Sequence, residues 1–95
     1  MYKGNEVWIV AESRFEWYTV KYICSSKEIA IKRWEELRGE MIQDNQRMVD
    51  ANKQYLIDYG YYDNCWEKHI EMLQNLKPGE RCDCDYPDLQ RWDVE

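Results

Sequence analysis

The chain has 95 residues, of which 44% are hydrophobic and 34% charged, and its formal net charge at pH 7 is −6. This length supports one domain, residues 1–95, with a modest hydrophobic core. The acidic balance argues against direct binding to nucleic acid and against an anionic membrane surface, because both attract basic proteins. It is compatible with a protein or nucleoprotein partner that has a basic surface.

The first quarter of the sequence predicts a β-hairpin over residues 7–24. Residues 7–11 form a short apolar run, and residues 17–24 are rich in aromatic and β-branched side chains. Residues 12–16 are polar enough to connect the two strands. Alternation along the second strand predicts one core-directed face, made of Tyr18, Val20, Tyr22 and Cys24.

A long helix is predicted over residues 25–59. Ser25 and Glu28 have the spacing of a capping box, in which each side chain bonds a free backbone N–H of the first turn. Gly39 is a weak point, but the helical period continues beyond it, which favours one continuous helix. The predicted apolar face consists of Ala30, Trp34, Leu37, Met41, Met48, Ala51 and Tyr55.

A second helix and a β-rich tail complete the predicted fold. Asn64 is the predicted N-cap with Glu67 at the capping-box position, and residues 77–79, Lys-Pro-Gly, end the helix. The tail predicts a strand over residues 82–86, a turn over 86–89 and a closing strand over 91–94. The sequence therefore predicts an α+β fold of order ββααββ, in which a two-helix hairpin packs on one face of a three- or four-stranded antiparallel sheet.

Four residues could form a structural zinc site. Cys65 and His69 are spaced i,i+4 on the second helix, and Cys82 and Cys84 share one side of the predicted tail strand. Three thiolates and one imidazole are a common zinc ligand set. Neither pair has the usual two-to-four-residue spacing between cysteines, and reduced core cysteines explain the thiols without a metal. A zinc-binding scaffold or assembly module is therefore an alternative function, and otherwise no cofactor is expected.

Enzymatic activity is not expected. The sequence holds one histidine, His69, and lacks a nucleophile elbow, a P-loop and a dinucleotide fingerprint. A Cys65–His69 dyad is conceivable, but neighbours at i,i+4 on a helix are more often surface or ligand pairs.

The surface character of the second half favours a binding role. Most of the acidity falls in residues 80–95, and a tyrosine-rich turn precedes the second helix. Acids on an edge strand also serve solubility alone. The residues predicted to contact a partner are Tyr61, Tyr62, Asp83, Asp85 and Asp88. A homodimer is also open, because long amphipathic helices often pair.

No secretory signal is evident at the start of the sequence, and no run approaches the about 20 apolar residues of a membrane span. The protein is therefore expected in the cytoplasm, with its four cysteines reduced.

The first third of the chain resembles short bacteriophage-encoded α+β proteins of mostly unassigned function. The matching features are the strand Val7-Trp8-Ile9-Val10, the strand that ends at Cys24, and the helix start over residues 25–30, Ser-Ser-Lys-Glu-Ile-Ala. Such phage proteins include inhibitors of host defence, among them anti-CRISPR proteins. The resemblance implies a stoichiometric inhibitor that acts by steric occlusion in the bacterial host cytoplasm.

Overall fold

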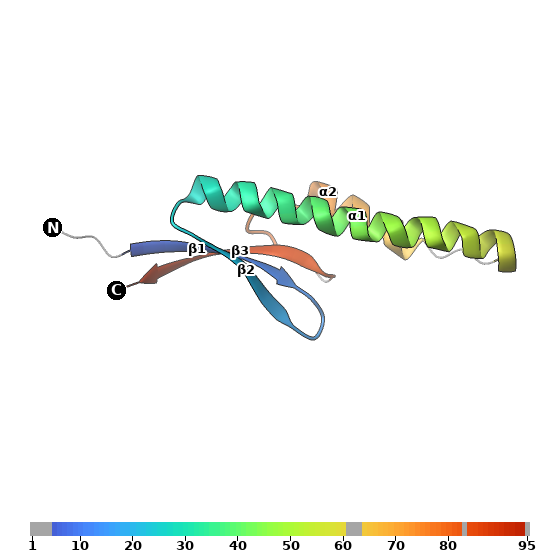
Figure 1. The fold of residues 1–95 in the computed structure, drawn as a ribbon, viewed down its shortest axis with the longest axis horizontal. Helices are drawn as coiled ribbons and strands as arrows, with labels where there is room; N and C mark the ends of the chain where they lie inside the picture. The colour runs from blue at the N-terminus through green and yellow to red at the C-terminus, as the bar shows by residue number, and fades with distance from the viewer. Residues whose placement is uncertain (1–4, 61–63, 83, 95) are drawn as a thin grey trace.

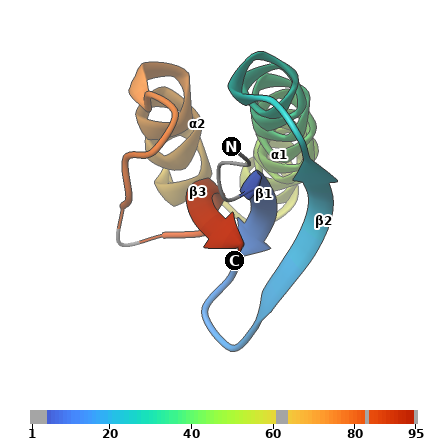
Figure 2. The ribbon, with the colours of Figure 1, turned by 90° about the vertical axis from the view of Figure 1, so that its left-hand side faces the viewer.

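The computed structural model describes residues 5–60, 64–82 and 84–94. It contains the strands β1 (Asn5–Ser13) and β2 (Tyr18–Cys24), the helices α1 (Lys27–Tyr59) and α2 (Cys65–Asn75), and the strand β3 (Tyr86–Val94). The strands form one antiparallel sheet in the order β2-β1-β3. Both helices lie on the same face of this sheet (Figure 1 and Figure 2). The α+β class is confirmed, but the element order is ββααβ rather than ββααββ.

The tail forms one strand where the sequence predicted two. Residues 86–89, the predicted turn, are the first part of β3, whereas Cys82 and Cys84 precede the strand. The prediction was wrong because Pro87 was taken as a turn residue. A proline is tolerated in an edge strand, and β3 is an edge strand of the described sheet. The Pro87 carbonyl also accepts a hydrogen bond from the indole Nε1 of Trp34 at 2.8 Å.

The long helix is continuous through Gly39, as predicted, but its N-cap lies one residue later than predicted. Ser26, not Ser25, caps α1, and its hydroxyl accepts a hydrogen bond from the Ile29 N–H at 3.2 Å. The helix ends at Gly60, whose φ of 74° lies in the left-handed region that glycine adopts at low cost.

The buried face of α1 follows the predicted stripe only as far as Met41. Beyond it the buried positions are Asn45 and Val49, while Met48, Ala51 and Tyr55 are exposed. The distal part of α1 extends past the end of the sheet, beyond the three described strands (Figure 1).

The second helix begins and ends near its predicted bounds. Asn64 is the N-cap, although its side chain makes no capping hydrogen bond, and Leu76 is the C-cap just before the Lys-Pro-Gly segment. Arg38 of α1 fixes this end, because its guanidinium donates to the Leu76 carbonyl at 3.0 Å and lies over the Trp34 ring.

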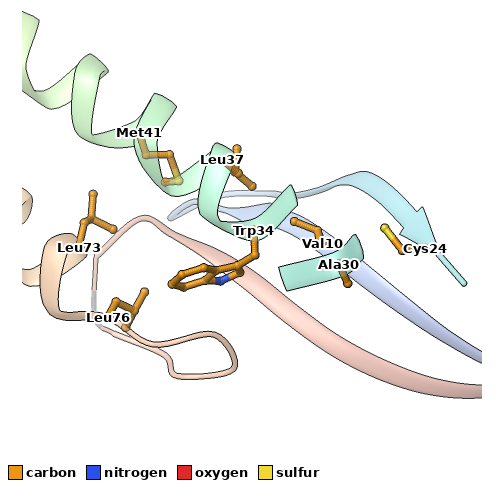
Figure 3. Close-up of a cluster of buried hydrophobic side chains, with 8 residues drawn as sticks. All are labelled: Val10, Cys24, Ala30, Trp34, Leu37, Met41, Leu73 and Leu76. Atoms are coloured by element: carbon orange, nitrogen blue, oxygen red, sulfur yellow. The ribbon is translucent and has the colours of Figure 1, made fainter. Parts of the chain in front are cut away.

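The hydrophobic core lies between the sheet and the two helices, as Figure 3 shows. Trp34 is central, and its indole reaches from α1 toward the end of α2. The buried cluster consists of Val10, Cys24, Ala30, Trp34, Leu37, Met41, Leu73 and Leu76.

A register shift divides β2 into two parts that use opposite faces. Val10 pairs with Tyr22, but the next residue, Ala11, pairs with Val20, so Lys21 is an extra residue, a β-bulge. Tyr22 and Cys24 face the helices, whereas Tyr18 and Val20 are exposed. The predicted single core-directed face was therefore wrong for its first half.

Candidate functional site

The acidic side chains of the tail are used within the molecule to a large extent. Asp88 is 2% exposed, and its carboxylate accepts hydrogen bonds from the Tyr18 hydroxyl at 2.6 Å and from Gln90 Nε2 at 2.8 Å. Its burial removes it from the exposed acidic surface that the sequence predicted. Asp83, Tyr61 and Tyr62 lie outside the described residues.

Asp85 organises the turn between β1 and β2. One carboxylate oxygen accepts the backbone N–H of Phe15 at 3.2 Å, and the other accepts the Arg14 guanidinium at 3.2 Å. Arg14 also pairs with Glu12, and its backbone N–H donates to the Trp17 carbonyl at 2.9 Å. The turn is therefore held both by its own backbone and by the segment that precedes β3.

This turn, residues 14–17, presents two aromatic side chains to solvent, and we call it the aromatic turn. Phe15 is 97% exposed and Trp17 is also exposed. Figure 2 shows the turn at the end of the hairpin farthest from the helices. The sequence predicted a polar connection over residues 12–16, and Phe15 was not among the predicted contact residues. One feature of the sequence could have revealed an exposed aromatic surface here. Two aromatic residues, Phe15 and Trp17, stand in a hairpin connection, where glycine, asparagine or aspartate is usual.

Three of the four predicted zinc ligands line one cleft of about 330 Å³, beneath the aromatic turn. His69, Cys82 and Cys84 line it together with Arg14 and Asp85, among other residues. Cys65 is exposed on α2 and is not among the lining residues. Within the described ranges, no group of three or more histidine, cysteine, aspartate or glutamate side chains is arranged to hold a metal ion.

Both ring nitrogens of His69 are engaged by hydrogen-bond acceptors. Nδ1 lies 3.0 Å from Asn45 Oδ1, and Nε2 lies 2.7 Å from the backbone oxygen of Asp85. Asn45 is fixed as an acceptor, because its Nδ2 donates to the Met41 carbonyl at 2.8 Å. In this conformation each ring nitrogen faces an oxygen atom of the protein within hydrogen-bond distance. His69 therefore connects α1, α2 and the segment before β3.

The face of the sheet that the helices leave uncovered is largely apolar, and we call it the open face. Strand pairing and alternation place residues of all three strands on it, and we define it by nine of them, three from each strand. They are Val7, Ile9 and Ala11 of β1, Tyr18, Val20 and Ile23 of β2, and Asp88, Gln90 and Trp92 of β3. In an antiparallel sheet with one face in solvent, apolar and polar residues normally alternate along each strand. In β1, residues 7–11 are all apolar.

The pKa of the Tyr18 phenol lies well above its usual range, chiefly because of burial. The hydrogen bond to Asp88 and the negative charge of that carboxylate raise this pKa further. Tyr18 therefore stays a hydrogen-bond donor over the whole physiological pH range, and the contact between β2 and β3 persists.

Comparison with protein-family models gave no match, and searches of the curated proteins and of the solved structures gave none either. Within the described parts of the chain, neither helix combines the length and the apolar composition that crossing a bilayer requires.

Proposed function

We propose that this protein is a non-catalytic binding protein that covers a surface of another protein through its aromatic turn. The observation that carries the proposal is the position of Phe15, a 97% exposed aromatic side chain on a turn fixed by Asp85 and Arg14. Moving a Phe side chain out of water contributes about 1.5–3 kcal/mol to binding. A turn that is already ordered loses little conformational entropy when it binds.

The composition of the turn matches that of strongly contributing interface residues. Aromatic side chains and arginine are enriched at such positions, and the turn reads Arg14-Phe15-Glu16-Trp17. A fitting partner has an apolar pocket for Phe15 and a basic surface around it, because this chain carries a net charge of −6.

The narrower proposal is that the partner is a bacterial host protein or nucleoprotein, which the protein inhibits by stoichiometric steric occlusion. It is supported by the likeness of the first third of the chain to phage proteins, including inhibitors of host defence. Tyr61, Tyr62 and Asp83 stay proposed contacts, and the aromatic turn is added to them.

The test is capture of a partner from bacterial lysate, followed by binding measurements with that partner in purified form. We expect the wild-type chain to bind in a fixed stoichiometric ratio, and Phe15→Ala with Trp17→Ala to weaken the affinity by at least about 30-fold. Calorimetry gives both the stoichiometry and the affinity. Circular dichroism checks that the variant keeps its fold.

The matched control is Ile29→Ala, which removes an exposed apolar side chain in the first turn of α1, far from the proposed contacts in sequence. It should bind like the wild type. Equal affinity of the turn variant and the wild type would exclude the aromatic turn, and turnover of the captured protein would exclude a non-catalytic role.

The host proposal has its own assay. Expressing the wild-type chain in bacteria with an active CRISPR defence should raise the plating efficiency of a targeted phage, and the turn variant should not raise it. No effect of the wild type would reject this defence system as the target while leaving the binding measurement standing.

A further inference from the structure

The central strand has the composition of a strand that is covered on both sides. Trp8 and Val10 pack toward the helices, while Val7, Ile9 and Ala11 belong to the open face. Continuous apolar strands are typical of sheets buried on both faces. In the described structure, the helices cover only one face of this sheet (Figure 2).

The polar groups of the open face already satisfy one another. Trp92 Nε1 donates to Gln90 Oε1 at 3.0 Å, and Gln90 Nε2 donates to Asp88 Oδ2 at 2.8 Å. The Tyr18 hydroxyl donates to the same carboxylate oxygen at 2.6 Å. This network spans β3 and β2, so these donors already have partners if water leaves the face.

Exposed charge is missing from the open face as defined. Asp88 holds the one carboxyl group among its nine residues, and it is 2% exposed. Arg91 alternates to the helix side, where it pairs with Glu6 at 2.6 Å. Both helices lie on the opposite side of the sheet (Figure 1 and Figure 2).

We propose that the open face binds the open face of a second copy of this chain, to form a symmetric dimer with two packed sheets. The layers would then be helices, sheet, sheet and helices, with the strands of the two sheets aligned within about 30°. A two-fold axis near Ile9 brings the same apolar surface of each copy together. This arrangement also places the helices of the two copies on the two outer sides of the dimer, away from the interface.

The exposed area fits a dimer. Ile23 is 70% exposed and Trp92 is 54% exposed, and Val20 and Tyr18 are nearly half exposed. Side chains of this size offer on the order of 500 Å² per copy, so two copies would bury about 1,000 Å², near the lower bound of a specific interface. The dimer is therefore expected to be reversible, and it does not rest on the function proposed for the aromatic turn.

Sedimentation equilibrium of the purified chain, without any partner, tests the proposal over concentrations from about 1 to about 300 µM. We expect a monomer–dimer equilibrium for the wild type. Ile23→Glu should weaken the dimer by at least about 100-fold, because it places unpaired carboxylates inside the interface. Ile23 is exposed in the single chain, so the substitution leaves the core intact, and circular dichroism checks this.

The matched control is Ile57→Glu, the same exchange at a 76% exposed position on α1. It should dimerise like the wild type. A wild type that stays monomeric, or an Ile23→Glu variant that dimerises unchanged, would overturn the proposal. Loss of the dimer in Ile57→Glu alone would assign self-association to the helices instead.

Discussion

The phenol of Tyr18 reaches from one outer strand to the other, because its hydroxyl bonds the buried Asp88 carboxylate of β3 while β1 lies between them. A single contact of this kind joins two strands that share no backbone hydrogen bonds. It also links the stability of the sheet to pH, because the phenol donates only while it is protonated.

Tyr18→Phe should change how stability depends on alkaline pH. The pKa of Tyr18 is raised in the folded chain, first by burial and then by Asp88, whereas in the unfolded chain it lies near its ordinary value of about 10. Below that value Tyr18 is neutral in both states. Above about pH 10 the unfolded state loses its proton first, so the wild type loses stability with rising pH.

Urea unfolding at neutral and alkaline pH measures this difference. Near neutral pH, Tyr18→Phe should be less stable by about 1 kcal/mol, through the lost hydrogen bond. Between about pH 9 and about pH 11 it should lose less stability than the wild type. Tyr59→Phe, at an exposed position, is the control. An alkaline loss in Tyr18→Phe as large as that of the wild type would contradict the assignment.

At the scale of the elements, α1 tolerates a glycine in its interior and needs another at its end. A Cβ built at Gly39 meets no atom within 4 Å, and the local backbone is helical. Gly60 has φ of 74°, which L-residues with a side chain adopt at a cost.

Gly39→Ala should stabilise the protein by about 0.5–1 kcal/mol, because alanine loses less backbone entropy when the helix forms. Gly60→Ala should destabilise it by about 1 kcal/mol. Urea or thermal unfolding, monitored by circular dichroism, measures the change in the free energy of unfolding for each substitution. Stabilisation by both substitutions would show that the end of α1 does not hold the left-handed conformation.

Helices were predictable here because their signals are local. The cap, the period and the terminating Lys-Pro-Gly lie within the segments they define, so the bounds of α1 and α2 are close to the predicted ones. The β-bulge at Lys21 depends on which residues β1 places opposite it. Local alternation could not reveal that shift, and it therefore assigned Tyr18 and Val20 to the wrong face.

The candidate surfaces were less predictable than the fold. Asp85 and Asp88 were predicted to contact a binding partner, but in the structure they bond groups about 70 residues away in the same chain, at the β1–β2 turn and on β2. Spacing alone does not place such partners. The aromatic turn was missed because exposure of Phe15 follows from the direction of the hairpin relative to the helices.

At the scale of the whole molecule, the two proposed binding events differ in their electrostatics. Dimerisation through the open face involves no exposed charge, while each copy carries −6 overall. Partner capture relies on attraction between this acidic chain and a basic surface.

The two affinities should therefore respond in opposite directions to salt. Raising NaCl from about 50 to about 500 mM should leave the dimer unchanged or tighten it, because salt screens repulsion between the copies. The same change should weaken partner binding. Sedimentation and calorimetry measure the two affinities separately, and a dimer that dissociates with salt would contradict the apolar interface.

The strand order β2-β1-β3 also determines when the fold can be completed during synthesis. The hairpin and α1 leave the ribosome early, but one edge of β1 is unpaired until β3, from the other end of the described chain, has been made. Until then the Trp34 indole lacks the Pro87 carbonyl that it bonds in the folded protein. The nascent chain therefore exposes an apolar strand edge until β3 has been made, and the fold is completed with the docking of β3.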